Sequence, residues 1–360
     1  MKIALLGDIG LFGKYTLDNP VIKEYFKEVS NLLKNMDVVI GNLEVPLCNT
    51  DTPKKGKSAS IRSNPKNVEL IKFLNITHVS LANNHVFDYG EQGYLETKKI
   101  LDENNIKYFG VENKNEFIIS EDNKIALSGY VCYSTNALGY LENNTIGVNE
   151  LDIDKVENNL SKNNKEGYLN IVSFHIGEEH IHYPNRNHIK LARKLSDKIP
   201  HIFYGHHPHV LQGIEKYKES LHIYSLGNFC FDDVYTKKSK EPLVKQKIAN
   251  KESAIIILNI ENNKLLDHKV IPIFDNGKEL SLPKDRVIEE KIKEYSNYLK
   301  IEEDLYNKTR TEKLNKYIES RKQLRNFNWY IKRLNLDTFL MLKNAKNNYK
   351  KYKKVLVDKL

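Results

Sequence analysis

Short apolar runs alternate with longer polar stretches along the first 275 residues of the chain. Five of these runs begin with aliphatic and β-branched residues, as strands buried on both faces do, and end on carboxylate, amide or imidazole side chains. The five runs are residues 2–8, 38–44, 77–85, 170–179 and 201–209. Helix-like stretches lie between them, for example residues 89–105 and 188–198. This alternation predicts an α/β layered architecture.

Polar side chains follow the predicted strands at the points where the strands end. In open α/β sheets, ligands bind beyond the carboxyl ends of the strands, so these side chains are expected to converge. They are Asp8, Asn42, Glu44, Asn84, His85, His175, Glu178, His207 and His209. A single one of them is ordinarily a helix cap, a turn residue or a satisfied buried histidine. Five such strand ends with oxygen and nitrogen donors and no cysteine indicate a site for manganese, iron, zinc or magnesium.

The segment from Tyr204 to Gln212 places three histidines around a proline, in a chain with 12 histidines among 360 residues. If the segment is extended, His207 and His209 share one face, and Pro208 stiffens the chain between them. Taken by itself, the segment is equally consistent with a polar surface turn. The metal interpretation therefore depends on the other strand ends.

The chain resembles a known family at six segments: GDIG, GNLE, SLANNHVFDYG, SFHIGEEH, YGHHPHVLQ and YSLGNFCFDD. They are similar to segments of the CapA, or poly-gamma-glutamate capsule-synthesis, family, which is related to the calcineurin-like metallophosphoesterases. The resemblance covers roughly residues 1–233 and the strands that follow. It implies a metallophosphatase-like sandwich of mixed β-sheets flanked by helices, and it leaves the last 75 or so residues unexplained.

The resemblance also implies a centre for one or two divalent ions (Mn, Fe, Zn or Mg). The implied ligands are Asp8, Asn42, Glu44, Asn84, His175, His206, His207 and His209. Asp8 and His209 would bind one metal, and His175 and His207 the other. Glu44, with or without Asn42, stands at the bridging position and Asn84 at that of an amide ligand. His206 is a ligand if the histidine run is read in another register.

Three further residues have implied catalytic roles. His85 would face the leaving group, Asp88 would orient His85 by accepting its second N–H, and Glu178 would serve as an extra ligand or general base. The sequence departs from the phosphoesterase pattern at two places: Gly10 stands where a histidine is usual, and Asn-Leu-Glu replaces the bridging aspartate. An amide therefore remains an alternative to a phosphoester as the bond that is cleaved.

The side chains that would recognise a substrate are less well defined by the sequence. The candidates are Asn228, Arg62, Tyr183 and Arg186. Asn228 follows Gly227 and is at least equally well explained as a turn residue. The Lys-, Gly- and Ser-rich stretch 54–63 could cover the site, but a solvated surface loop is the simpler interpretation.

The last 75 residues differ in charge from the rest of the chain. Residues 286–360 hold 20 of the 56 Lys and Arg side chains but only 10 of the 47 Asp and Glu, so the net charge of +9 belongs to this tail. Helical spacing occurs at Ile292, Tyr295, Leu299 and Tyr306, and again at Phe327, Ile331 and Leu334. We expect two or more helices with a break near residues 335–337. The basic segment 343–359 could contact an anionic polymer, an anionic membrane surface or capsule-synthesis proteins, or be a solvated helical face.

Composition narrows the class and location of the protein. No apolar run approaches the ~18 residues that span a bilayer, and the N-terminal apolar stretch is too short for a signal peptide. We therefore predict a cytoplasmic protein, with peripheral contact at the inner membrane surface as an alternative. No nucleic-acid-binding motif accompanies the basic charge, so a nucleic-acid partner is not expected. The absence of a GxxxxGK[ST] segment excludes a P-loop mechanism.

The sequence thus predicts two parts, a metallophosphatase-fold domain over residues 1–285 and a basic α-helical extension over residues 286–360. The predicted function is that of a metal-dependent hydrolase acting on a phosphoester or amide bond. Its context would be the synthesis or modification of a capsular or cell-surface polymer, such as poly-gamma-glutamate or a polysaccharide. The alternative is a non-catalytic accessory protein of a capsule synthase complex.

Overall fold

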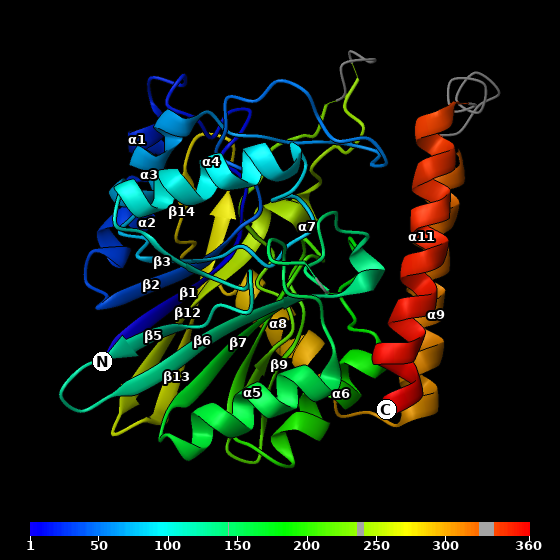
Figure 1. The fold of residues 1–360 in the computed structure, drawn as a ribbon. Helices are drawn as coiled ribbons and strands as arrows, with labels where there is room; N and C mark the ends of the chain where they lie inside the picture. The colour runs from blue at the N-terminus through cyan, green and yellow to red at the C-terminus, as the bar shows by residue number, and fades with distance from the viewer. Residues whose placement is uncertain (143, 236–240, 324–334) are drawn as a thin grey trace.

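The computed structural model describes residues 1–142, 144–235, 241–323 and 335–360. Two β-sheets pack face to face, and helices cover their outer faces (Figure 1). The predicted α/β layered sandwich of mixed sheets is confirmed.

The first sheet has the strand order β14-β13-β12-β1-β2-β3-β4, with β11 paired to β1. Its strands are β1 (Lys2–Ile9), β2 (Val38–Leu43), β3 (His78–Ser80), β4 (Lys107–Phe109), β11 (Asn228–Cys230), β12 (Glu252–Glu261), β13 (Lys264–Asp275) and β14 (Leu280–Ser281). Strands β1 to β4 run parallel to one another, so their carboxyl ends meet at one edge.

The second sheet has the order β5-β6-β7-β8-β10-β9. Its strands are β5 (Glu116–Ile119), β6 (Lys124–Val131), β7 (Leu169–His175), β8 (His201–His206), β9 (Ile214–Tyr217) and β10 (Ser220–Ile223). The four central strands β6, β7, β8 and β10 are parallel, and the two edge strands are antiparallel. The sheet therefore also gathers its carboxyl ends at one edge.

Apolar side chains from both sheets fill the space between them. The buried cluster includes Ile3, Leu5, Ile40, Ile171, Ile202 and Ile256. Polar contacts also cross this layer. Ser173 Oγ of β7 lies 3.1 Å from Ser80 Oγ of β3, and the Tyr204 hydroxyl donates to the backbone carbonyls of Leu6 and Ile40 in the opposite sheet. This hydrogen bonding fixes the carboxyl end of β8 against the ends of β1 and β2.

Helices cover the outer face of each sheet. The first sheet packs against α1 (Ile22–Tyr25), α2 (Lys27–Leu33), α3 (Val68–Phe73) and α4 (Gly90–Glu103), and the second against α5 (Ile153–Lys165) and α6 (Arg186–Ser196). The shorter elements are α7 (Ile248–Lys251) and the 3₁₀ turns η1 (Pro65–Asn67), η2 (Tyr133–Thr135) and η3 (Val357–Lys359). The helix predicted at 188–198 begins two residues earlier because Asn185 caps it, accepting from the N–H of Asn187 at 3.0 Å.

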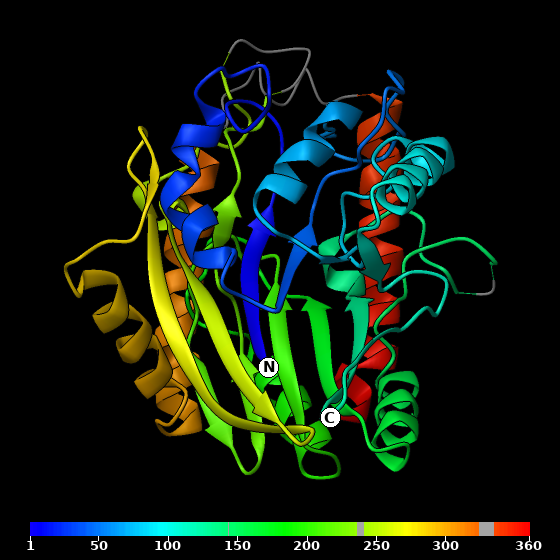
Figure 2. The same cartoon turned by 90° about the vertical axis from the view of Figure 1, so that its left-hand side faces the viewer.

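The C-terminal region is helical. Its first helix packs against β9 and β13, and the residues after it pack onto the second sheet's helical layer. The region contains α8 (Val287–Tyr298), α9 (Glu303–Gln323) and α11 (Leu336–Val355). Its side chains Leu299, Tyr306, Tyr352 and Leu356 are buried in the same cluster as residues of β7, β8, α5 and α6. Helices α9 and α11 run along the same side of the molecule but lie apart from each other (Figure 2).

The expected break near residues 335–337 is confirmed, because Asn335 caps α11 by accepting from the N–H of Thr338 at 2.9 Å. Residues Phe327, Ile331 and Leu334, which have helical spacing in the sequence, lie outside the described residues. A helix does begin at Val287, but a domain boundary at residue 285 stays a prediction. Within the described part of the chain, no helix has both the length and the apolar character needed to cross a bilayer.

Candidate metal centre

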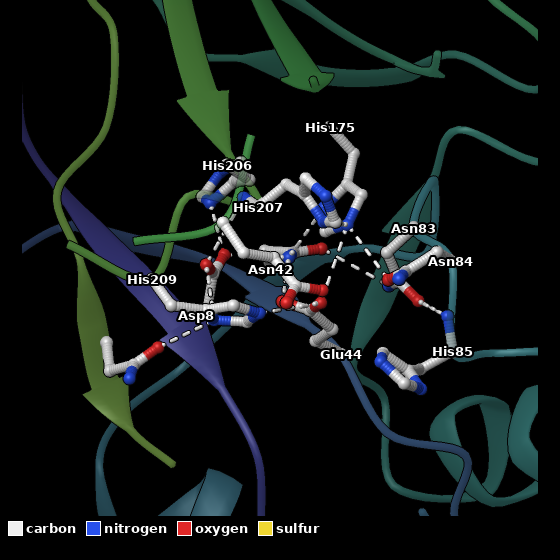
Figure 3. A network of polar contacts seen from close by, with 12 residues as sticks. Asp8, Asn42, Glu44, Asn83, Asn84, His85, His175, His206, His207 and His209 are labelled. Atoms are coloured by element: carbon white, nitrogen blue, oxygen red, sulfur yellow. Dashed lines mark hydrogen bonds and ion pairs between the residues drawn. The ribbon is translucent and has the colours of Figure 1, made fainter. Parts of the chain in front are cut away.

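The two sheets bring their carboxyl ends together, and the candidate ligands lie there. Asp8 lies near the end of β1 and pairs with Asn42 on β2 and Asn228 on β11. His175 and His206 are paired at the ends of β7 and β8. Figure 3 shows the side chains from the two sheets pointing toward one another. The convergence that the strand ends predict is therefore present.

The histidine segment reaches the site by a turn, so the extended conformation considered in the sequence is wrong. Strand β8 ends at His206, and the backbone φ angles of His207 and His209 are 96° and 56°. Non-glycine residues with positive φ are uncommon and cost free energy. The turn is held by the His207 N–H, which donates to Asp8 Oδ2 at 3.3 Å. Both imidazoles still point into the same space, but by turn geometry and not by strand alternation.

One group of donor atoms surrounds His175 Nε2. Asn84 Oδ1 lies 3.0 Å from it, His207 Nδ1 3.1 Å and Glu44 Oε1 3.4 Å. The other ring nitrogen, Nδ1, faces the Asn42 amide nitrogen at 3.4 Å. A single ring proton on Nε2 can serve only one of three neighbours, whereas a cation accepts lone pairs from all of them. These four side chains therefore have the arrangement of a cation site.

A second group contains Asp8, Glu44 and His209. His209 Nδ1 lies 2.8 Å from Asn228 Oδ1 and 3.4 Å from Asp8 Oδ2, and its Nε2 lies 3.6 Å from Glu44 Oε1. When the proton on Nδ1 is donated to Asn228, the Nε2 lone pair is free on the side of Glu44. Glu44 belongs to both groups, so its carboxylate lies between two sets of potential ligands, and its role as a bridging ligand stays a prediction.

The electrostatics of Glu44 test whether a cation fits. Its carboxylate is fully buried, and Oε1 has no hydrogen-bond partner in the described structure. Burial, followed by the negative charges of Asp8 and Glu179, raises the pKa of Glu44 well above its usual value. The imidazole of His175 is likewise destabilised as a cation, because burial and the neighbouring histidines hold its pKa well below 6.5. An isolated buried carboxylate is costly, and a divalent cation would compensate it, so the residues present fit such an ion.

Asp8 is held in position by two residues that lie outside these donor groups. His206 Nδ1 is 2.8 Å from Asp8 Oδ1, and the Asn42 amide donates to the same oxygen at 2.9 Å. Burial would raise the pKa of Asp8, but the contacts with His206 and His209 lower it overall. His206 Nε2 has no partner in the described structure. The geometry therefore makes His206 and Asn42 supports of Asp8, and their role as ligands stays a prediction.

His85 lies beside the centre and contacts Asp88. Its Nδ1 is 2.7 Å from Asp88 Oδ2, in the arrangement expected for a carboxylate that orients an imidazole. Lys57, from the loop between β2 and η1, reaches the same pair and lies 2.6 Å from Asp88 Oδ1. The Lys-rich composition of that loop favours a solvated surface loop, so the sequence gives no specific signal for this buried contact.

Glu178 is not brought to the centre, whereas its neighbour Glu179 is close to it. Glu178 Oε2 pairs with Arg310 of α9 at 2.5 Å, and Oε1 accepts from Asn185 at 3.0 Å. Burial alone would raise the pKa of Glu179, but the imidazoles of His207 and His209 lower it. The Glu179 side chain is 45% exposed, so part of it is in contact with solvent. Gly177, with φ of 127°, redirects the chain after β7 and changes which glutamate faces the histidines.

Three of the four predicted substrate-binding side chains are occupied elsewhere. Arg62 pairs with Asp51 and donates to the carbonyls of Asn49 and Thr50. Tyr183 packs between Tyr295 and Tyr298, and Arg186 lies over the ring of Tyr306. Arg62 therefore stabilises the loop around residues 49–51, and Tyr183 and Arg186 contact the C-terminal extension. The structure gives no support to a substrate-binding role for them.

Asn228 and Asn83 support the centre through hydrogen bonds. Asn228 bonds His209 through Oδ1 and donates its amide to Gln246 Oε1 and the Asn250 carbonyl. Asn83 was not singled out from the sequence, although it adjoins Asn84. Its amide donates to Asn42 Oδ1 at 3.2 Å, and its Oδ1 accepts from the N–H groups of His85 and Val86. The sequence feature that could have identified Asn83 is the pair of asparagines directly before His85.

Gly10, where phosphoesterases usually have a histidine, is closed to a side chain. A Cβ on Gly10 would lie 2.7 Å from the Phe12 ring and 2.8 Å from the Phe231 ring. The Phe231 ring instead packs near His209, with the ring centroids 4.7 Å apart. The Asp8–Glu44–His209 group therefore has one potential nitrogen ligand fewer than the phosphoesterase pattern. An ion at this group would be bound by the remaining donors.

The fold and these residues define an α/β sandwich protein with a candidate two-group cation site at its strand ends. Residues 2–233 match the family described as bacterial capsule synthesis protein PGA_cap. The chain belongs to this family.

Two relatives have assigned names. The chain is 30% identical to the capsule biosynthesis protein CapA of Bacillus anthracis, over 71% of this chain and 66% of that protein. It is also 30% identical to the PGA biosynthesis protein CapA of Bacillus subtilis (strain 168), over 68% of this chain and 67% of that protein. The match thus spans about two-thirds of the length of these relatives. Of the solved structures, the NAD nucleotidase of Haemophilus influenzae aligns with 90% of this chain and 60% of its own, at a TM-score of 0.42 and 13% identity. Because this TM-score is low, the family assignment rests on the sequence matches.

Proposed function

We propose that the protein is a metal-dependent hydrolase that cleaves a phosphoester bond during the synthesis or modification of a cell-surface polymer, such as poly-gamma-glutamate or a polysaccharide. The observation that carries the proposal is the buried Glu44 carboxylate, whose Oε1 lacks a hydrogen-bond partner and is shared by two groups of potential metal ligands. Family membership supports the capsule context.

The residues of the chain divide the work as follows. Asn84, His175, His207 and Glu44 would hold one divalent ion, and Asp8, His209 and Glu44 another. When bound in such a site, divalent ions polarise a phosphoryl oxygen and lower the pKa of coordinated water. His206, Asn42 and Asn228 hold Asp8 and His209 in place, as partners of ligands do elsewhere.

His85 would handle the proton at the leaving group. With Nδ1–H held on Asp88, Nε2 is the ring nitrogen that would take up a second proton, giving the imidazolium, and pass it to a departing oxygen. Glu179 is close enough to His207 and His209 for their charges to affect its pKa, and it takes the place proposed from the sequence for Glu178 as an extra ligand or general base. Its partial exposure leaves room for a substrate to approach it.

An amide bond is the second candidate for cleavage. The observation that favours it is the closed space at Gly10, which removes a nitrogen ligand usual in phosphoesterases. The accessory role differs from both, since it requires no turnover.

For the extension, we propose contact with capsule-synthesis proteins or an anionic polymer, although several of its basic groups are already paired, such as Lys351 with Glu142 and Lys359 with Asp154.

Hydrolysis assays on the purified protein test the proposal. The protein is stripped with chelator, reloaded with Mn²⁺, Zn²⁺ or Mg²⁺, and assayed with bis(p-nitrophenyl) phosphate and with a γ-glutamyl peptide. We expect phosphodiester turnover that chelator abolishes and metal restores. Turnover of the peptide alone would assign the amide reaction. Metal binding without turnover of either substrate would favour the accessory role.

A further inference from the structure

The loop between β2 and η1, residues 44–64, contains one lysine whose side chain is directed into the protein. The Lys57 side chain is 9% exposed, whereas Lys54 and Lys55 of the same loop are exposed. The loop is also covered at its tip, where Gly56 is buried and a Cβ added to it would lie 3.2 Å from Asn344 of α11. Lys57 therefore differs from its neighbours in a way that composition does not indicate.

The ammonium of Lys57 is committed to three atoms of the segment 84–88. Its Nζ lies 2.6 Å from Asp88 Oδ1 and 3.1 Å from His85 Nδ1, and it donates to the backbone carbonyl of Asn84. Two of the three N–H donors of the ammonium serve Asp88 Oδ1 and the Asn84 carbonyl, whereas the contact with His85 Nδ1 is not a hydrogen bond while that nitrogen donates its own proton to Asp88. Lys57 is thus not available to bind a substrate anion.

Asp88 connects this lysine to the imidazole. The carboxylate is fully buried, with Lys57 at Oδ1 and both the Ile61 N–H and His85 Nδ1 at Oδ2, at 2.8 and 2.7 Å. A buried carboxylate needs a compensating charge, and Lys57 supplies it at close range. The same loop therefore compensates the charge of Asp88 and, through Ile61, fixes its orientation.

We propose that Lys57 is a positioning residue for His85. Together with Asp88 it fixes the imidazole with Nδ1 on the carboxylate, which leaves Nε2 as the ring nitrogen presented to a substrate. The consequence for turnover rests on the proposed hydrolase function, whereas the fixed ring orientation and tautomer do not.

The test replaces Lys57→Met and uses Lys55→Met, an exposed position of the same loop, as the matched control. Magnesium- or zinc-loaded proteins with ¹⁵N-labelled histidine rings are compared by NMR, with the His85 signals assigned from His85→Gln. We expect a single tautomer of His85, protonated at Nδ1, in the wild type and in Lys55→Met, and mixed tautomers in Lys57→Met. Metal content should be unchanged.

The kinetic readout is bis(p-nitrophenyl) phosphate turnover. We expect kcat to fall about 10- to 100-fold in Lys57→Met, the range found when a residue that orients a catalytic group is lost, with KM changed less than about twofold. If the wild type shows no turnover, the proposed function fails, but the NMR comparison still decides the role of Lys57. An unchanged His85 spectrum in Lys57→Met would overturn the proposal.

A second variant guards against misfolding of Lys57→Met. Lys57→Gln keeps an N–H donor for Asp88 but removes the charge, so we expect the same changes in the His85 spectrum and in kcat, with a smaller amplitude. A folded, metal-loaded Lys57→Gln protein that matches the wild type in both readouts would contradict the proposal.

Discussion

Two buried clusters of histidine and carboxylate in this protein differ in how their polar atoms are satisfied. The first, here named the Glu44 cluster, consists of Asp8, Glu44, His175, His207 and His209. The second, the Glu215 cluster, lies between α6 and the second sheet and consists of Arg193, Ser196, Glu215, His222 and Tyr224. They contain similar acidic and imidazole groups, so residue type alone does not distinguish them.

In the Glu215 cluster every carboxylate oxygen meets a donor. Glu215 accepts from Arg193 at 3.2 and 2.8 Å, from the Tyr224 hydroxyl at 2.8 Å, and contacts His222 Nδ1 at 3.1 Å. Ser196 Oγ lies 2.7 Å from His222 Nε2, which gives the order of a hydrolase triad. Ser196 is only 5% exposed, however, and Arg193 occupies the carboxylate, so the network is structural.

The Glu44 cluster lacks such a cation. Around His175 Nε2 one ring proton faces more than one acceptor, and Glu44 Oε1 has no hydrogen-bond partner in the described structure. The pKa values differ accordingly: that of Glu44 is raised by burial and by nearby carboxylates, whereas burial of Glu215 is outweighed by hydrogen bonds that lower its pKa to about 2. The contrast supports the proposal that a metal would take, in one cluster, the part that Arg193 takes in the other.

The largest expected effect is that of His207→Ala on metal binding and turnover. Removal of a ligand should lower metal affinity and activity by at least about 100-fold, since loss of a ligand's supporting partner already costs 10- to 100-fold. Metal content is measured by mass spectrometry and turnover by phosphodiester hydrolysis. The thermal midpoint of the chelator-treated protein should change little, because the sheet core does not need this imidazole. Full activity in the variant would show that His207 is not a metal ligand.

Glu215→Gln should lower the stability of the protein and leave metal binding unchanged, the reverse of His207→Ala. Removing the carboxylate leaves the partly buried Arg193 guanidinium unpaired, so we expect the free energy of unfolding to fall by about 2–3 kcal/mol. Denaturant titration of chelator-treated protein measures this loss. Metal content at saturation should equal that of the wild type, and a variant that loses metal would show that the two clusters are not independent.

The pH dependence of stability should follow Glu215 in acid. Its folded pKa of about 2 lies below the unfolded value of about 4.3, so its contribution is complete above pH 4.3 and is lost as the pH falls toward 2. Unfolding free energies measured between pH 5 and 2 should therefore decline more steeply in the wild type than in Glu215→Gln. Parallel curves would show that Glu215 is not stabilised in its charged form.

The smallest expected effect, and the one of opposite sign, is that of Glu44→Gln on the metal-free protein. Because the buried carboxylate lacks a compensating cation without metal, the neutral amide should raise the free energy of unfolding by about 1 kcal/mol. The comparison uses chelator-treated wild type and variant, with Glu215→Gln as the destabilising reference. A marked loss of stability in metal-free Glu44→Gln would mean that protein groups already satisfy this carboxylate.

The sequence predicted the sheet layers and the convergence of the strand ends, because both follow from runs of buried residues and from parallel strand direction. It could not predict which glutamate after β7 faces the histidines. That choice depends on the positive φ of Gly177 and on the pairing of Glu178 with Arg310, which is 132 residues away. Long-range pairs of this kind leave no local pattern in a single sequence.

The roles of individual loop residues could not be predicted from the sequence either. Lys57 lies in a Lys-, Gly- and Ser-rich stretch whose composition favours exposure, and its burial arises only from the fold of residues 44–64 over Asp88. Tyr183 and Arg186 were predicted at the site because of their chemistry. They are instead covered by Tyr295 and Tyr306 of the extension, whose position the sequence did not indicate.

Anomalous diffraction from crystals soaked in Zn²⁺ tests the central claim most directly. We predict one or two peaks at about 2.0–2.2 Å from ligand atoms, with Glu44 contacting each ion: one beside His175 and His207, the other beside Asp8 and His209. Anomalous maps without a peak at Glu44, with Glu44 Oε1 hydrogen-bonded to a protein group instead, would contradict it.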